Sequence, residues 1–397
     1  MDARFGGTQS ARPPSIIRKS SIGTEARIYA IPRFLDGHRR AKSDSAIIMH
    51  DHTPLRVLLT GGAGFLGKRV ISELRELAES RSRLVHIRSL DLLACESADE
   101  SVVGDITDAS VVDEATRKID VVIHAAAMID WGNTPQSRLF AVNLDGTRHV
   151  LSSARRHGVR ALLYTGTMDV VMDGGPLCAI DESQPYPARF LDAYSESKAL
   201  AEQEVLRAND DGLRTVVLRA CGMYGEADPY HMENVLAAVR DGKLSFRIGS
   251  PKTVFEHVYV GNVAYAHALA ALAIVEDEPP TITGRKYFVT DQDADNFFEF
   301  MREFVERLGY EFPPASRSIP GPVAMLAGRA NEAFAKLVQP LWKLRPVLTR
   351  SSVAVLTNSI SIASSRLRDD LGYAPRYTPE EAFDRVLRYY AQDPGDA

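Results

Sequence analysis

The sequence of 397 residues has few cysteines, no excess of positive charge and no long apolar run. Its three cysteines, Cys95, Cys178 and Cys221, form no CxxC pair, which argues against a disulfide framework or a zinc knuckle and favours a reducing, cytoplasmic compartment. The formal net charge of −5 argues against nucleic acid as a partner. The longest apolar stretch, Val263 to Val275, spans about 13 residues and is too short to cross a membrane.

The first 53 residues differ in composition from the rest of the chain. They hold nine Lys or Arg and five Asp or Glu, a local charge of +4, and show no sustained apolar period. We predict a flexible basic leader over residues 1–53. A transit peptide is the alternative, although acidic residues such as Glu25 and Asp36 count against it. No metal site is predicted anywhere in the chain.

From Leu55 onward, short β-branched runs alternate with helical stretches, which is typical of βαβ units around a parallel sheet. Candidate strands are Arg56 to Thr60, Leu84 to Leu90, Val121 to His124, Ala161 to Thr165 and Thr215 to Arg219. Candidate helices are Phe65 to Glu79, Ser137 to His157, Ala193 to Ala208 and, later, Asn296 to Leu308. The pattern predicts an α/β fold with a Rossmann-type doubly wound parallel sheet.

A glycine motif follows the first candidate strand. Gly61, Gly64 and Gly67 are spaced as GxxGxxG between the apolar run Val57 to Thr60 and a helical pattern that begins at Phe65. Glycine allows the tight turn and lets backbone N–H groups approach a pyrophosphate at the start of the helix. Because the strand and the helix are both present, the motif predicts a dinucleotide site rather than an ordinary glycine turn.

An acidic residue, Asp91, ends the next candidate strand. A carboxylate there can accept hydrogen bonds from the adenine ribose and repels a 2′-phosphate, so NAD is favoured over NADP. The nearby Arg88 is a reservation, since an arginine could accommodate that phosphate. The alternative for Asp91 is an ordinary turn residue.

We therefore expect a NAD-binding domain over residues 54–225, with its sheet completed by part of 253–290. The chain after Tyr224 is less regular and rich in proline. It predicts a smaller C-terminal substrate-binding domain over residues 226–397.

Tyr194 and Lys198 form a YxxxK pair inside a predicted helix, which places the phenol and the ammonium on one face. Free tyrosine has a pKa near 10, and an adjacent ammonium stabilises the phenolate that a general base requires. The pair follows the glycine turn by roughly 130 residues, and Thr167 lies after a candidate strand between them. This combination is far more specific than YxxxK alone.

The chain resembles the extended short-chain dehydrogenase/reductases, and within them the 3β-hydroxysteroid dehydrogenase and sterol-4α-carboxylate 3-dehydrogenase family. The resemblance covers about Pro54 to the C-terminus. The strings that carry the closer likeness are His124 to Asp130, Asn143 to Thr147, Tyr164 to Thr167, Leu218-Arg219 with Tyr224 to Glu226, and His257 to His267.

The resemblance implies a role for each matching residue. Tyr194 would accept the proton, Lys198 would hold the nicotinamide ribose, and Thr167 would hydrogen-bond the substrate oxygen. The implied catalytic residues are Tyr194, Lys198, Thr167 and Asn143, the last supporting the site from its helix. The implied cofactor-binding residues are Gly61, Gly64, Phe65, Leu66, Gly67, Asp91, Asp105, Ile106, Ala125, Ala126, Tyr194 and Lys198.

Two departures from the family pattern stand out. Gly166 and Thr167 occupy positions where the family often has two serines, which leaves a single hydroxyl. Ala220 stands where a proline commonly follows Leu-Arg, so we expect a looser backbone beside the nicotinamide.

The implied activity is NAD-dependent oxidation of a secondary alcohol, of 3β-hydroxysteroid or sterol-4α-carboxylate type, to a ketone by hydride transfer, with loss of carbon dioxide where a carboxylate lies β to the ketone. The alternatives are a nucleotide-sugar epimerase or dehydratase, a reductase of long-chain β-keto acids, and a non-catalytic dinucleotide sensor. The resemblance also implies a homodimer.

Features on the substrate side allow two interpretations each. Met128, Ile129 and Trp131 fit an apolar wall or simple packing. The basic amphipathic segment Pro320 to Leu348 fits either a membrane interface, which would admit a sterol-like partner, or a lid or core helix. Three histidines are expected to be buried or capping groups rather than metal ligands. These are His124, His257 and His267.

Overall fold

The computed structural model describes residues 53–129, 134–276, 278–279, 281–291, 293–338 and 348–392. Residues 1–52 of the predicted leader therefore lie outside the described residues. Among the described helices, none is long and apolar enough to cross a membrane.

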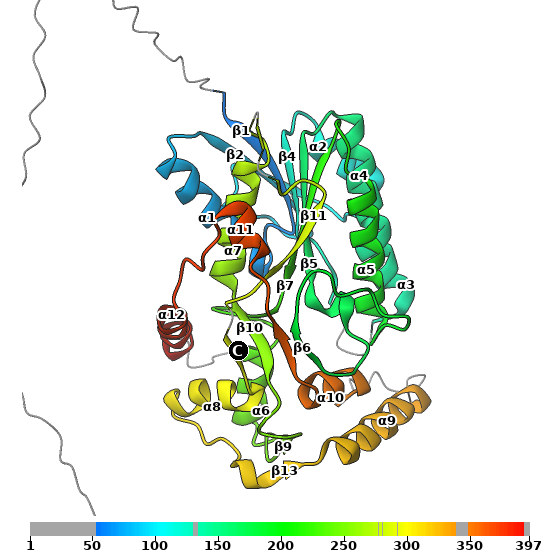
Figure 1. Ribbon diagram of the computed structural model, residues 1–397, viewed down its shortest axis with the longest axis vertical. Coiled ribbons are helices and arrows are strands. Elements are labelled where there is room, and N and C mark those ends of the chain that lie inside the picture. Colours follow the sequence, from blue (N-terminus) through cyan, green and yellow to red (C-terminus); the bar gives the residue numbers. More distant parts are fainter. Residues whose placement is uncertain are drawn as a thin grey trace, which may run out of the picture. The chain divides into compact units, whose positions relative to one another are not determined.

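A seven-stranded sheet, parallel throughout, forms the centre of the fold (Figure 1). In spatial order its strands are β11 (Arg285–Val289), β7 (Arg214–Ala220), β5 (Ala161–Thr167), β4 (Val121–His124), β1 (Leu55–Thr60), β2 (Val85–Asp91) and β3 (Glu100–Val103). Consecutive residues such as Val57 and Leu58 are both fully buried, because both faces of the sheet are covered. The predicted α/β class and doubly wound parallel sheet are confirmed.

Helices pack on both faces of this sheet (Figure 1). One face is covered by α1 (Phe65–Ser80) and α7 (Val260–Ala273). The other is covered by α2 (Ala109–Thr116), α4 (Gly146–Arg156) and α5 (Ala193–Arg207). The α7 segment was not predicted as a helix, because it is apolar on all sides and shows no amphipathic period.

The predicted helix over 137–157 is one helical stretch with a change of pitch. It consists of α3 (Gln136–Phe140), a π-helical turn over Ala141–Asp145 and α4. A π turn adds a residue to the helical turn and often marks a functional position. Here it contains Asn143.

The chain beyond β7 contributes to both the central sheet and a separate group of small elements. β11 lies within the stretch expected to complete the sheet, whereas β10, from the same stretch, joins a three-stranded sheet with β8 and β12. The small strands are β6 (Leu177–Ile180), β8 (Gly222–Tyr224), β9 (Arg247–Ile248), β10 (Phe255–Tyr259), β12 (Asp293–Asp295), β13 (Ser318–Ile319) and β14 (Ile360–Ile362). The remaining helices are α6 (Met232–Arg240), α8 (Phe297–Arg307), α9 (Gly321–Val338), α10 (Arg350–Thr357), α11 (Arg366–Leu371) and α12 (Pro379–Gln392), with 3₁₀ turns at Met168–Val171 and Ala315–Arg317.

The C-terminal segment returns to the first helix of the fold. Arg376 forms an ion pair with Glu73 of α1 at 2.8 Å, across a separation of 303 residues. The Tyr377 hydroxyl donates to the same carboxylate at 2.6 Å, and the Tyr377 N–H donates to Asn262 Oδ1 of α7 at 2.8 Å. These contacts fix the end of the chain to α1 and α7.

Candidate active site

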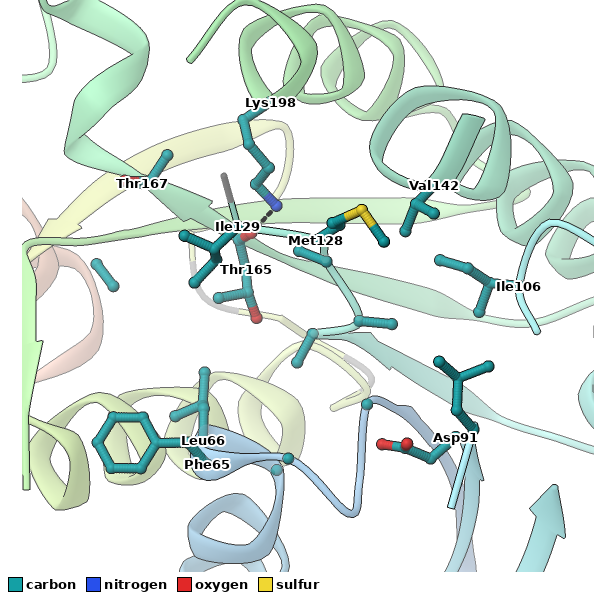
Figure 2. A pocket seen from close by; sticks show the side chains of 18 of the residues that line it. Phe65, Leu66, Asp91, Ile106, Met128, Ile129, Val142, Thr165, Thr167 and Lys198 are labelled. Carbon is teal, nitrogen blue, oxygen red and sulfur yellow. Dashed lines mark hydrogen bonds between the residues drawn. The ribbon is translucent and has the colours of Figure 1, made fainter. Parts of the chain in front are cut away.

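A cavity of about 400 Å³ lies at the carboxyl ends of β1, β2, β4, β5 and β7 (Figure 2). This is where parallel α/β sheets bind ligands, because the loops that follow the strands meet there. Every predicted cofactor-binding residue lines the cavity, and so do Thr167, Tyr194 and Lys198. Asn143 alone among the predicted site residues does not line it.

The glycine turn forms one wall of the cavity. Gly61 has φ +78°, and a Cβ there would lie 2.8 Å from the Ala126 backbone nitrogen, so only glycine fits between β1 and the loop after β4. Gly64 precedes α1, and no side chain of the described residues caps the start of this helix. The first N–H groups of α1 are therefore available to an anion, and the turn fits a pyrophosphate.

Asp91 faces this turn from the end of β2. Its Oδ2 accepts from the Ala63 N–H at 3.0 Å and its Oδ1 from the Leu93 N–H at 3.2 Å. Arg88 is held elsewhere, since it pairs with Glu100 and donates to the Ala115 carbonyl at 2.9 Å. Arg88, which could have accommodated the 2′-phosphate of NADP, thus does not line the cavity.

Asp105, Ile106 and Arg138 surround the far end of the cavity. Arg138 Nη2 donates to Asp105 Oδ2 at 3.0 Å. Ile106 and Val142 add apolar surface across from Asp91 (Figure 2). This end therefore suits a flat, partly polar ring with a ribose beside Asp91.

Lys198 lies at the opposite end and is almost fully buried (Figure 2). Its ammonium donates to the Thr165 carbonyl at 2.8 Å and lies 4.2 Å from the centre of the Tyr164 ring. Burial lowers the pKa of Lys198 to about 7, and the carboxylate of Glu202 partly opposes this. The ammonium is thus held in place but poorly solvated.

Tyr194 is positioned by the start of α5. Asp192 caps this helix by accepting from the Ser195 N–H at 2.8 Å, which fixes the turn that carries Tyr194. Burial raises the pKa of Tyr194 well above 10, the carboxylates of Asp169 and Asp192 raise it further, and a hydrogen bond with Thr167 acts in the opposite direction. The phenol is neutral here, and a positive charge is needed to make it a base near neutral pH.

Thr167 ends β5 and supplies the hydroxyl beside Tyr194. A Cβ on the preceding Gly166 would lie 3.0 Å from Val217 Cγ1 and 3.2 Å from Glu202 Oε2. A serine at position 166 would therefore crowd the buried residues behind the strand. A side chain at position 166 requires these neighbours to shift by a few tenths of an ångström, which glycine avoids.

The looser backbone expected at Ala220 is not observed. Ala220 is the last residue of β7, is buried, and pairs with Thr167 on one side and Val289 on the other. A strand flanked by two neighbours is held in place without proline.

Asn143 supports the site from behind the cavity. Its Oδ1 accepts from the Met128 N–H at 2.8 Å, and its Nδ2 donates to the Met128 carbonyl and to Ser197 Oγ, each at 3.0 Å. It thereby joins the loop after β4 to α5. The π turn places Asn143 where it can reach both.

The three predicted histidines are buried, as expected. His124 Nδ1 lies 2.7 Å from Thr60 Oγ1, and His267 Nε2 lies 2.9 Å from Thr165 Oγ1. His257 stacks on Phe300 with ring centroids 3.9 Å apart, and its Nε2 has no partner among the described residues. Burial lowers the pKa of all three.

The sequence did not single out several residues of the cavity wall. Of the two interpretations for Met128 and Ile129, the structure favours the apolar wall, since both line the cavity, whereas Trp131 lies outside the described residues. Arg138, Cys221 and Tyr230 also line it. None of these three residues belongs to a sequence motif. Only Arg138 lies in a predicted element, the helix over 137–157.

A parallel sheet, a glycine turn that opens a helix, and a Thr, Tyr and Lys set in one cavity define a dinucleotide-binding α/β enzyme. The sequence model of the 3-beta hydroxysteroid dehydrogenase/isomerase family matches residues 58–318, and the chain belongs to that family.

Two relatives illustrate the range of the family. The chain is 34% identical over 351 residues to a 3β-hydroxysteroid dehydrogenase/Δ5→4-isomerase of Mycobacterium tuberculosis, covering 84% of this chain and 90% of that one. It is 32% identical over 340 residues to a decarboxylating sterol-4-alpha-carboxylate 3-dehydrogenase of Schizosaccharomyces pombe, covering 85% and 98%.

Solved structures share the fold at lower identity. A UDP-glucose 4-epimerase of Thermus thermophilus in complex with NAD has a TM-score of 0.60 at 24% identity and covers 84% of this chain and 98% of its own. A short-chain dehydrogenase/reductase superfamily protein of Agrobacterium tumefaciens with bound NAD has a TM-score of 0.62 at 18% identity, covering 85% and 97%.

Proposed function

We propose that this protein is a NAD-dependent dehydrogenase that oxidises the secondary alcohol of a 3β-hydroxysteroid or sterol-4α-carboxylate to a ketone. The observation that carries the proposal is that one cavity joins the glycine turn and Asp91 to Thr167, Tyr194 and Lys198. The family and its named relatives support the sterol class.

The residues present fit NAD. The uncapped start of α1 beside Gly61 and Gly64 would receive the pyrophosphate, and Asp91 would accept hydrogen bonds from the adenine ribose. Asp105, Ile106, Ala125 and Ala126 would line the adenine half, and Phe65, Leu66 and Gly67 line the cavity near the glycine turn. When bound, NAD would supply the hydride acceptor.

The chain's own residues would move the proton and hold the substrate. Thr167 would hydrogen-bond the carbinol oxygen, and Tyr194 would accept its proton. Lys198 would favour the phenolate of Tyr194 through its charge. Asn143 would keep the loop at Met128 and helix α5 in register.

An apolar substrate suits the cavity better than a nucleotide sugar. Met128, Ile129, Met223 and Tyr230 are among its lining residues. Within the described part of the wall, the only basic side chains are Arg138 at the far end and Lys198 at the reaction centre. A nucleotide sugar requires further basic groups for its diphosphate, which this wall does not present.

The proposal is tested by NADH formation, followed by absorbance. Purified protein would be supplied with NAD or NADP and a panel of 3β-hydroxysteroids, with carbon dioxide trapped from a 4α-carboxysterol. We expect turnover of at least one sterol with NAD. Saturable turnover of a nucleotide sugar alone would overturn the proposal.

We also propose peripheral membrane contact through α9. Val323, Leu326 and Phe334 are 57%, 70% and 55% exposed and share one face of this helix, with Arg329 beside them. We expect the protein to pellet with anionic vesicles on sedimentation. A variant carrying Leu326→Ser and Phe334→Ser should stay in the supernatant. Equal recovery of both would exclude this surface.

Three broader inferences accompany the proposal. We propose a cytoplasmic, homodimeric enzyme in which residues 226–397, apart from the part of 253–290 that completes the sheet, form the substrate-side domain. The resemblance to the family supports the dimer. Light scattering would measure the oligomeric state.

A further inference from the structure

His124 ends β4 directly before the alanines of the cavity wall, and the proposed chemistry gives its side chain no role. The residue is only 1% exposed. Thr60, at the end of the neighbouring strand β1, and Thr147, on α4, are fully buried beside it. Thr60 Oγ1 lies 2.7 Å from His124 Nδ1, and Thr147 Oγ1 lies 3.0 Å from His124 Nε2. Both ring nitrogens therefore have a hydroxyl partner.

The two hydroxyls connect the ring to two separate parts of the site. Thr60 Oγ1 accepts a hydrogen bond from the N–H of Ala126, a residue of the cavity wall, at 3.2 Å. Thr147 Oγ1 donates to the main-chain carbonyl of Asn143, in the π turn, at 2.6 Å. His124 is thus the middle of a chain of hydrogen bonds that runs from the loop after β4 to the π turn.

The direction of each bond in this chain follows from the number of protons. A carbonyl only accepts, so the single hydroxyl proton of Thr147 is used on Asn143, and His124 Nε2 must donate to Thr147. Burial lowers the pKa of His124 to about 3, so the ring is neutral and its Nδ1 carries no proton. Nδ1 then accepts from the hydroxyl of Thr60. All bonds of the chain point from Ala126 towards Asn143, an arrangement in which each bond strengthens the next.

We propose that His124 is a positioning residue that holds the loop at Ala126 in register with the π turn at Asn143. This inference rests on the proposed function and goes beyond it, because it assigns a role to a side chain that touches neither the cofactor nor the substrate. Packing alone would require only a ring of this size at position 124. The chain of hydrogen bonds requires both ring nitrogens.

The two ends of the chain act on different parts of the reaction. The Ala126 backbone packs against Gly61, where a Cβ would come within 2.8 Å of the Ala126 nitrogen, so this end sets the width of the proposed NAD site. The Asn143 side chain donates to Ser197 Oγ, and Ser197 Oγ donates to the Tyr194 carbonyl at 2.8 Å. This end therefore positions the turn of α5 that carries the proposed base.

Isosteric variants of the two threonines test the two ends separately. Thr60→Val removes the acceptor of the Ala126 N–H, so KM for NAD, and Kd by calorimetry, should rise about three- to tenfold while kcat stays nearly unchanged. Thr147→Val leaves the Asn143 carbonyl without this donor, so kcat with a 3β-hydroxysteroid should fall by a similar factor while NAD binding is kept. His124→Phe breaks the chain in the middle and should show both effects. Thr60→Ser and Thr147→Ser keep the hydroxyl and should behave like the unmodified protein.

Thr116→Val is the matched control. Thr116 is fully buried on α2, donates to the Val112 carbonyl at 2.7 Å and lies outside the described wall of the cavity. The control loses one buried hydrogen bond and should change neither NAD binding nor kcat. If Thr60→Val and Thr147→Val change these constants no more than the control does, or both change them in the same way, the role of His124 in positioning is wrong.

The outcomes separate this inference from the function on which it rests. NAD binding is measured without a sterol, so the Thr60 end is tested even if no sterol is turned over. Absence of turnover in the unmodified protein would overturn the proposed function alone. If His124→Phe fails to fold, nitrogen NMR of the unmodified protein still decides. We expect a proton on His124 Nε2 and none on Nδ1, and the reverse tautomer would overturn the inference.

Discussion

Glu202 and Arg219 form an ion pair that is fully buried between α5 and β7, and the loss of either partner should be severe. Arg219 Nη2 donates to Glu202 Oε1 at 2.6 Å, and its Nε lies 3.1 Å from both carboxylate oxygens. Tyr186 donates its hydroxyl to Glu202 Oε1 at 2.7 Å. Arg219 Nη1 has no partner among the described residues, so the carboxylate is the main compensation for a buried guanidinium.

The expected size of the effect follows from this geometry. Substituting Glu202→Gln removes the charge, keeps the volume and leaves Arg219 buried without a counterion. Breaking a buried pair in this way costs about 3–5 kcal/mol of unfolding free energy, whereas replacing both partners by apolar residues is close to neutral. The double variant Glu202→Leu with Arg219→Met should therefore recover most of the loss.

Urea denaturation of the single and double variants would measure these free energies. Glu306→Gln is the control, because Glu306 pairs with Arg302 on the exposed surface of α8 at 2.8 Å and should contribute less than about 1 kcal/mol. If Glu202→Gln costs no more than Glu306→Gln, the argument from burial is wrong.

Three further predictions concern the cofactor, the base and pH. Tyr194→Phe removes the proton acceptor, so we expect turnover to vanish while NAD binding, measured by calorimetry, persists; residual turnover above a few per cent would contradict its role. Asp91→Ser removes the ribose-facing carboxylate, so it should lower kcat/KM with NAD at least about tenfold and relax the discrimination against NADP. Initial rates with NAD and NADP that match those of the unmodified protein would refute this role. The pKa of His257 is lowered to about 3, so below pH 6.5 only the unfolded chain binds its proton, and stability falls by about 1.4 kcal/mol per pH unit. His257→Phe, stacked on Phe300, should reduce the loss of unfolding free energy between pH 7 and 5 by about 2 kcal/mol, and identical losses would argue against a neutral buried imidazole.

Sequence patterns predicted the parts of the fold whose chemistry depends on local spacing. The glycine turn at Gly61 and the pair Tyr194 and Lys198 could be found because a tight turn and a shared helix face each require fixed residue types at fixed intervals. The central strands were found because they are short apolar runs buried on both faces. The edge strand β3 was missed, since half of Glu100–Val103 is polar and it lies at the margin of the sheet.

The unpredicted parts depend on contacts between distant segments. Part of 253–290 was expected to complete the sheet, and β11 does so, but no local pattern specifies its partner β7, some 65 residues away. Thr167 and Cys221 line the same cavity from the end of β5 and from the residue after β7, so their proximity exists only in the folded chain. The tight packing at Gly166 depends on Val217 and Glu202, which are likewise distant in sequence.

The return of the C-terminal segment to α1 also constrains how the protein is made. During synthesis on the ribosome, α1 emerges early, but Arg376, which binds Glu73, follows 303 residues later. The seventh strand of the sheet, β11, is also translated after every residue that lines the cavity. The nascent chain must therefore carry β7 unpaired on one side until β11 emerges, and Glu73 without its ion-pair partner until Arg376 emerges. This is the interval in which a chaperone would protect it.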